Sequence, residues 1–471
     1  MLKKLVSLFL AALLSCSLLA QVADEKPTIT LQSRSLVSSG EQVPFWLQSN
    51  QLGMIDPEDS FQQLFLFQLF GKSQKSNNNL AVSYGLSLLG RLADHAVFQP
   101  VEYWSRMHRK QWYLHLGAKS EPIFADGLSL TNGNLFLSNN ARPMPRIGFG
   151  ATDFRPFNQG WLSRFFFDLE YNEYFLLDDR VVENANLHHK RLDISYMISP
   201  EWTFSAGLDH WAHWGGNSPE YGQLPGFEDY IRYVFGKVGS ESAPDTDRNN
   251  VAGDHLGQYI VSLEHDTKKH QLSFYWQHLW EDGSGMRFEN APDGLWGVHW
   301  KEKKMHQLLE SVVLEYVNTR HQSGRFHKEP DPDHPGEVFG NGRDNYFNNS
   351  VYRSGFVSYQ RMIGLPLFMP GINEDGISTG FANTRMWVIH HGMGGWFSDD
   401  VNWKTQVTYS KHYGQHGAEY DSPAELFSLG AQLAYSLPQK PLSFSLKLAY
   451  DRGAIMDSGF GAEFRMALKL N

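Results

Sequence analysis

The sequence predicts an all-β fold, a transmembrane antiparallel outer-membrane β-barrel of about 16–18 strands. Three observations predict this class. Residues 1–20 have the features of an export signal, many segments of about ten residues alternate apolar with polar side chains, and aromatic residues stand near the ends of those segments. A soluble β-sandwich also alternates in this way. However, a sandwich of 471 residues would need several domains, and no linker separates any two of them.

The export signal is the first element in the chain. Lys3 and Lys4 supply its charged start, and the apolar run that follows is too short for a membrane helix. We expect cleavage near Ala20, which changes the net charge from −10 to −12 and leaves residues 21–471 as one barrel domain. Cys16, the single cysteine, lies inside the signal, so the mature chain has no thiol for a disulfide or a metal. Acylation of Cys16 is the alternative, on a loose sequence match.

The barrel strands are recognised by their alternation, which is clearest in residues 441–451 and 459–470. Each segment puts apolar side chains on one face and has the length that a tilted membrane strand needs. Single-chain bacterial barrels usually have an even number of strands, so about seventeen recognisable segments indicate sixteen or eighteen. The segments are 61–71, 79–91, 98–107, 110–119, 144–151, 162–173, 187–198, 202–212, 257–266, 269–280, 307–319, 352–363, 384–394, 401–411, 426–437, 441–451 and 459–470.

Several connections between these strands are long and polar, mainly 213–256, 281–306 and 320–351. In a membrane barrel the long loops lie outside the cell and the short turns face the periplasm. Residues 224–238 predict a short helix with Phe227, Ile231 and Phe235 on one face, and residues 41–58 predict a short element before the first recognised strand.

No pattern in the sequence indicates catalysis or metal binding. His188–His189 and His390–His391 are neighbours in strands and therefore point to opposite faces, so neither pair is expected to hold one metal ion. The acidic loop 327–337 lacks the spacing of a known calcium loop. The chain also has no basic stripe, so nucleic acid is not an expected partner. We expect no metal, no cofactor and no enzymatic activity.

Four stretches together resemble one known family. They are 137–150 (LSNNARPMPRIGFG), 207–216 (GLDHWAHWGG), 340–368 (beginning GNGRDNYFNNSVYRSG) and 383–395 (NTRMWVIHHGMGG). In this order and at this spacing they resemble the Wzi family of capsule assembly proteins, over nearly all of the chain after the signal. The chain departs from many such barrels by ending on Asn471 instead of an aromatic residue.

The resemblance implies both a structure and a function. The structure is an outer-membrane barrel of about eighteen strands with short helical elements and infolded loops that occlude the lumen. The function is that of a non-enzymatic surface lectin that helps attach or assemble capsular polysaccharide. Outer-membrane lipid and other capsule export components are the remaining expected partners. The main alternative is a porin or substrate-specific channel, which would conduct ions. An enzyme acting on lipid or glycan, with carboxylates such as Asp168 and Glu170, is a third reading.

The candidate polysaccharide-binding residues lie mainly in residues 340–355. Sugar binding calls for aromatic faces that stack on rings, and for amide and guanidinium groups that bond to hydroxyls. The same side chains also build turns and brace barrel interiors. Two further arginines, Arg142 and Arg146, either bind an acidic sugar or, as we favour, hold a loop across the lumen. Two tryptophans, Trp211 and Trp214, either stack on sugar or serve as packing and interface residues. The full set is Arg343, Asp344, Asn345, Tyr346, Asn348, Asn349, Arg353, Arg142, Arg146, Trp211 and Trp214.

Overall fold

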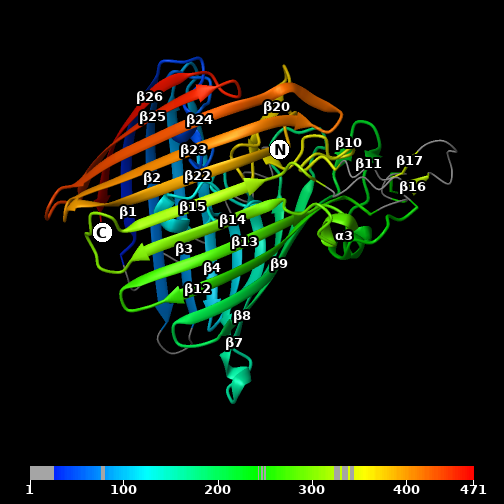
Figure 1. Ribbon diagram of the computed structural model, residues 1–471, viewed down its shortest axis with the longest axis horizontal. Helices are drawn as coiled ribbons and strands as arrows, with labels where there is room; N and C mark the ends of the chain where they lie inside the picture. Colours follow the sequence, from blue (N-terminus) through cyan, green and yellow to red (C-terminus); the bar gives the residue numbers. More distant parts are fainter. Residues whose placement is uncertain are drawn as a thin grey trace.

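The computed structural model describes residues 26–75, 80–241, 243, 244, 248, 251–322, 329, 330, 338, 339 and 344–470. Within these residues, eighteen strands form one closed antiparallel barrel (Figure 1). Strand β1 (Thr28–Ser38) pairs with β2 (Phe61–Lys75) on one side and with β26 (Gly459–Leu470) on the other, which closes the sheet. The other barrel strands are β3 (Leu80–Leu92), β4 (Val97–Arg109), β5 (Trp112–Ala118), β6 (Pro145–Phe154), β7 (Phe165–Phe175), β8 (Asn186–Met197), β9 (Trp202–Trp214), β12 (Asp254–Asp266), β13 (His270–Trp280), β14 (Gly294–Glu302), β15 (Ser311–Asn318), β22 (Met386–Ser398), β23 (Val401–Gln415), β24 (Ala418–Ser436) and β25 (Leu442–Gly453).

The fold class and the even strand number are confirmed, but one predicted strand was wrong. Residues 352–363 do not span the wall. They run inside the barrel and contain the small hairpin of β18 (Val357–Ser358) and β19 (Arg361–Met362). Most of their side chains are buried against the rest of the plug and the wall, whereas Arg353 and Gln360 are exposed. Two wall strands, β1 and β14, were not predicted. The predicted signal peptide lies outside the described residues.

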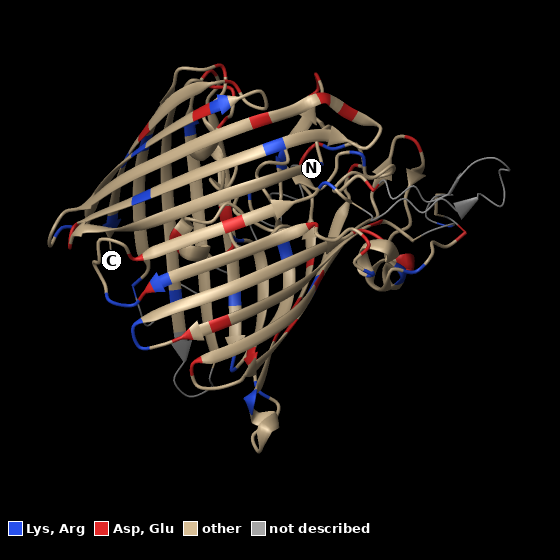
Figure 2. Cartoon of the chain, in the orientation of Figure 1, with Lys and Arg blue, Asp and Glu red and all other residues tan. Residues whose placement is uncertain are grey.

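The outer face of the barrel carries a belt of exposed apolar side chains. In β25, for example, the predicted face is confirmed, since Leu446, Leu448 and Tyr450 are all exposed. Figure 2 shows the strands largely free of charge, with Lys, Arg, Asp and Glu as isolated bands. Such a surface suits contact with lipid acyl chains. Other exposed members of the belt are Leu31, Phe65, Leu114, Phe149, Leu192, Phe204, Leu208, Phe274, Leu314, Ile389, Leu429 and Phe464. Among the described helices, none is long and apolar enough to cross a membrane.

The two ends of the barrel differ in the length of their connections. At one end the strands are joined mostly by short turns, as between β22 and β23 or between β12 and β13. At the other, the long-loop end, lie the small hairpins and most of the short helices, α3 (Tyr230–Phe235) among them, drawn on the right in Figure 1. In membrane barrels of this kind, the end with the long loops is the one that faces the cell exterior. The two short elements predicted from sequence are confirmed as α2 (Phe45–Gln48) and as η3 (Phe227–Asp229) with α3.

The hydrophobic core lies inside the barrel. Three segments from the long-loop end, residues 39–60, 119–144 and 344–381, fold back into the lumen, and we call them the plug. Five of its largest side chains, Trp46, Phe136, Tyr346, Phe356 and Phe368, are almost completely buried. Burying an apolar side chain of this kind contributes roughly 2–3 kcal/mol. The predicted infolded loops are therefore confirmed.

Candidate functional site: the plug, the lumen wall and the mouth

The plug is fastened to the wall by polar side chains that point inward from the strands. Glu315 on β15 accepts hydrogen bonds from Ser129 Oγ (2.7 Å), Leu130 N (2.8 Å) and Thr131 Oγ1 (2.8 Å). Gln277 on β13 donates to the carbonyl of Gly133 (2.6 Å), and its own oxygen accepts from a plug backbone N–H. These bonds satisfy backbone groups that the lumen hides from water, which would otherwise cost free energy.

Glycine lets the plug approach the wall closely at one point. Gly392 on β22 faces inward, and a Cβ at this position would stand 2.4 Å from the carbonyl oxygen of Leu128. The same carbonyl accepts a hydrogen bond from His390 Nε2 at 2.7 Å. The 3-10 helix η1 (Phe124–Gly127), just before Leu128, therefore lies against bare backbone. A larger residue at 392 would push this part of the plug away from the strand.

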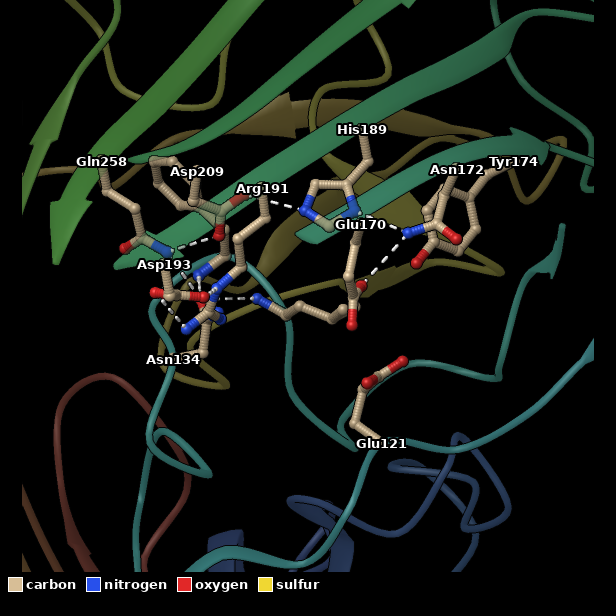
Figure 3. A network of polar contacts seen from close by, with 12 residues as sticks. Glu121, Asn134, Glu170, Asn172, Tyr174, His189, Arg191, Asp193, Asp209 and Gln258 are labelled. Carbon is tan, nitrogen blue, oxygen red and sulfur yellow. Dashed lines mark hydrogen bonds and ion pairs between the residues drawn. The ribbon is translucent and has the colours of Figure 1, made fainter. Parts of the chain in front are cut away.

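A chain of polar side chains crosses four neighbouring strands on the lumen wall (Figure 3). Asn172 on β7 bonds to Nδ1 of His189 on β8 (3.0 Å), whose Nε2 bonds to Asp209 on β9 (2.9 Å). Gln258 on β12 donates to the other oxygen of Asp209 (2.9 Å) and to Asn134 of the plug (2.9 Å). The chain thus ties strands β7 to β12 to one another and to the plug.

This arrangement braces the wall and does not form a catalytic site. An Asp–His pair can serve as a base only if the second imidazole nitrogen is available to a substrate or nucleophile. Both nitrogens of His189 are already bonded, and its ring stacks on Trp211 with centroids 3.9 Å apart. His188, its neighbour in sequence, points to the opposite face and pairs with Glu173 (2.5 Å), as expected for a strand. No described cluster of His, Cys, Asp and Glu side chains could hold a metal ion.

A further tie joins the plug to the wall at Arg146. This β6 residue is buried, and its guanidinium forms an ion pair with Glu121 of the plug (3.0 Å) and donates to the hydroxyl of Tyr174. A buried arginine needs such partners, because an unpaired buried charge is costly. Arg142, half-buried in the plug, lies over the ring of Tyr359 at 3.8 Å.

An open cleft of about 370 Å³ lies at the mouth of the barrel, on the long-loop end. Its floor is fixed by the buried ion pair between Arg180 and Asp178 (3.0 Å), and Arg180 also donates to the carbonyl of Val357 (2.7 Å). The floor is thus continuous with the plug. The cleft is lined by Leu176, Leu177, Asp178, Asp179, Arg180, Glu183, Asn184, Asp375 and Ile377, of which Asp179, Glu183, Asn184 and Asp375 are exposed.

The structure places most of the candidate stretch 344–349 within the plug. Tyr346 is fully buried, and its hydroxyl donates to Asp293 (3.0 Å) and accepts from Asn290 (2.7 Å). Asn348 exchanges two hydrogen bonds with the backbone of Phe381, at 2.9 and 2.8 Å. Asn345 accepts from Thr384 Oγ1 (2.7 Å) and donates to a glutamine side chain. The polar groups of Tyr346, Asn348 and Asn345 thus form hydrogen bonds with other parts of the chain.

The remaining candidates divide between interior and surface. Asn349 caps its own turn by accepting from Val351 N (2.8 Å) and Tyr352 N (3.0 Å). Trp211 is fully buried, whereas Trp214 is partly buried and donates to Glu173 (3.0 Å). Arg353 is half-exposed at the mouth, 3.5 Å from Glu220. Arg343 lies outside the described residues. Sugar binding by any of these residues stays a prediction.

Asp344 belongs to a group of carboxyls between the plug and the wall. Burial, together with the carboxylates of Asp344 and Asp254, raises the pKa of the Glu281 carboxyl well above its usual value. Glu281 also accepts a hydrogen bond from Phe347 N (2.6 Å), so it holds the plug backbone in place. Nearby, burial raises the pKa of Asp293 to about 7.

Apart from Arg146, sequence reasoning did not single out the residues that fasten the plug, namely Glu315, Gln277, Gln258, Glu121 and Asp209. Their signal is present but weak, because each occupies an inward position of an alternating strand or lies in a polar loop. Inward positions of any barrel are polar, so the pattern alone does not separate an anchor from a water-facing side chain.

The comparisons with known proteins decide the family. The family model for the capsule assembly protein Wzi matches residues 36–369, well over half of the chain. The chain belongs to the Wzi family of capsule assembly proteins. The match includes the first three of the four stretches that carry the resemblance, and the fourth, 383–395, follows the matched residues. Family membership and the closed barrel with its apolar belt place this Wzi-family protein in the outer membrane, with a role in capsule assembly.

Among solved structures, this Wzi-family chain is similar in overall shape to proteins of Pseudomonas aeruginosa. OpdQ matches with a TM-score of 0.48 and 10% identity, over 96% of this chain and 99% of that one. The outer membrane protein OprD matches with a TM-score of 0.46 and 10% identity, over 95% and 96%. OccK3, also called OpdO, matches with a TM-score of 0.44 and 12% identity, over 96% and 97%. A search of the curated proteins gave no match.

Proposed function

We propose that this Wzi-family protein is a non-enzymatic, lectin-like protein that holds capsular polysaccharide non-covalently at the cell surface. The observation that carries the proposal is the family match, which covers most of the barrel wall and nearly all of the plug. The filled lumen supports it further. A barrel whose core is packed with buried aromatic side chains meets a long polymer at its mouth, not through a central channel.

The mouth offers two places for contact with a polysaccharide. One is the cleft, where exposed carboxylate and amide groups such as Asp179, Glu183 and Asn184 can bond to sugar hydroxyls. The other is the rim around Arg353, whose half-exposed guanidinium can bond to hydroxyls or acidic substituents. Both surfaces face the cell exterior, where an exported polymer is found.

The first test is capsule retention in a deletion strain, comparing cell-bound with released polysaccharide. We expect polysaccharide to be made in normal amount but shed into the medium. Complementation with the wild-type chain should restore the cell-bound fraction, which controls for effects on synthesis. Unchanged retention in the deletion strain would rule out the attachment role. Purified protein incubated with the polysaccharide should leave its chain length unchanged, whereas shortening would indicate an enzyme.

Single substitutions then separate binding from structure. Arg353→Ala and Asp179→Ala should weaken binding of purified polysaccharide while leaving the heat-unfolding midpoint unchanged, since both side chains are exposed. Lys440→Ala, at an exposed turn on the opposite end, is the matched control and should change neither quantity. Asn345→Ala distinguishes two roles. Loss of stability with unchanged affinity assigns this residue to the plug, and loss of affinity alone assigns it to the sugar site.

A further inference from the structure

The short helix α3 lies on the outside of the barrel wall, beside the long-loop end of β9 (Figure 1). Its residues contact outward-facing side chains of β7 and β8. The hydroxyl of Tyr230 lies 2.6 Å from that of Tyr171, and Phe235 lies under the ammonium of Lys190 at 5.1 Å. Tyr171 and Lys190 point outward because their neighbours Asn172 and His189 belong to the lumen network.

The strand register fixes the height of α3 on the wall. Tyr171, Lys190 and His210 are paired across β7, β8 and β9 and form one outward row, which α3 contacts at Tyr171 and Lys190. The next outward row, two residues nearer the middle of the barrel, consists of Leu169, Leu192 and Leu208. Two residues along a strand correspond to roughly 7 Å. The helix therefore begins where the apolar belt ends.

One side of the segment formed by η3 and α3 is apolar and strongly exposed, and only its edge at Phe235 also contacts the wall, through Lys190. Phe227, Ile231 and Phe235 are 80%, 59% and 65% exposed, and Val238, just after the helix, is 52% exposed. Their spacing of four residues places the first three on one face. These exposures exceed those of Leu192 and Leu208 in the neighbouring belt, which are both 43%. An apolar face of this kind is unfavourable in water and is typical of helices that lie in a membrane interface.

We propose that residues 227–238 form an interfacial anchor whose apolar face inserts among the outer-leaflet lipids. Its occupant is lipid acyl chain, because the face lies directly above the exposed apolar belt and continues it towards the rim. The opposite side of the same helix covers Lys190, His188 and Glu173, which would otherwise face the edge of the bilayer. The anchor thus shields a polar part of the wall and holds the rim at a defined depth. A second copy of the chain is the competing occupant.

The experiment measures the environment of a fluorophore attached to Ile231→Cys in a Cys16→Ser background. The matched control is Ile372→Cys on β20 (Pro370–Ile372), which is also exposed but belongs to the mouth. Each purified protein is checked for barrel formation by its heat-modifiable migration and is reconstituted into phosphatidylcholine liposomes. Fluorescence is then quenched either by iodide in the buffer or by lipids with a nitroxide on the upper acyl chain.

The expected result is a severalfold stronger quenching of the Ile231→Cys label by nitroxide lipid than by iodide, with the opposite order for Ile372→Cys. Iodide quenching of the 231 label equal to that of the control would place the face in water and overturn the proposal. Protection from both quenchers, together with self-quenching that grows with protein density, would assign the face to a second copy and would also overturn it. The result does not depend on polysaccharide binding.

Discussion

At the scale of single residues, Asp293 joins the plug to the wall through its buried carboxyl. The carboxyl accepts hydrogen bonds from Asn318 Nδ2 (2.7 Å), Gln322 N (2.6 Å) and the hydroxyl of Tyr346 (3.0 Å). Burial raises its pKa from 3.8 to about 7, although the hydrogen bonds from Gln322 and Tyr346 act in the opposite direction. The folded protein therefore retains a proton that the unfolded chain has already released between pH 4 and 7.

This difference predicts the direction of a pH effect on stability. Stability falls as pH rises from about 4 to 7, because over this range the unfolded state binds fewer protons than the folded state, and it levels off above pH 7. The loss is at most roughly 4 kcal/mol, from about 1.4 kcal/mol for each pH unit. We expect Asp293→Asn to reduce the pH dependence of the heat-unfolding midpoint, measured in detergent between pH 5 and 8. Asp375→Asn, at an exposed carboxyl, is the control, and an equal slope in both variants would contradict the assignment.

Residue types in the stretch 344–353 are compatible with both a sugar site and a plug, and sequence could not separate the two. Asn349 bonds to the backbone of its own turn, and Asn348 bonds to the backbone of Phe381, 33 residues away in the chain. Arg353, in contrast, points outward because the chain turns there at the mouth. The distinction comes from tertiary contacts with segments far along the chain, such as Asp293 for Tyr346.

At the scale of secondary structure elements, close packing between a strand and the plug predicts an asymmetric response to one methyl group. Gly392→Ala places a Cβ 2.4 Å from the Leu128 carbonyl, whereas Gly90→Ala in β3 meets no atom within 4 Å. Overpacking of this kind costs roughly 1–3 kcal/mol. We expect Gly392→Ala to lower the heat-unfolding midpoint and Gly90→Ala to leave it nearly unchanged. Equal heat-unfolding midpoints for the two variants would show that the segment around η1 can move to accommodate the methyl group and is not closely packed against the wall.

The strands that sequence missed show what alternation can and cannot indicate. In β1 the outward positions include Ser33 and Ser35, so the apolar face is interrupted. In β14 the inward positions include Leu295 and Gly297, so the inner face is not polar enough to alternate clearly with the outer one. The prediction of a wall strand at residues 352–363 was wrong for the opposite reason. They are rich in apolar side chains because they are buried inside the plug, and a short apolar run does not distinguish a wall strand from a core segment.

At the scale of the whole molecule, the lumen of the barrel is filled by loops from its own long-loop end. The apolar belt faces lipid, the polar inner wall bonds to the plug, and the mouth carries the exposed carboxylates and Arg353. The belt could be predicted from sequence because a two-residue period reports directly on a two-sided wall, and the even strand number because single-chain barrels usually have one. The way in which the plug fills the lumen could not, because it depends on pairings such as Glu315 with Leu130, 185 residues apart in the chain.

The filled lumen predicts that this Wzi-family protein conducts few ions. In planar bilayers we expect the wild-type barrel to show no steady conductance above the baseline. Glu315→Ala removes the acceptor shared by Ser129, Leu130 and Thr131, and each buried group left unpaired costs about 1–3 kcal/mol. This variant should therefore open transiently as its plug loosens. Glu425→Ala, at an exposed carboxylate of β24, should stay closed. A steady conductance in the wild type would contradict the filled lumen and favour the channel, whereas transient openings confined to Glu315→Ala would show that the plug is the barrier.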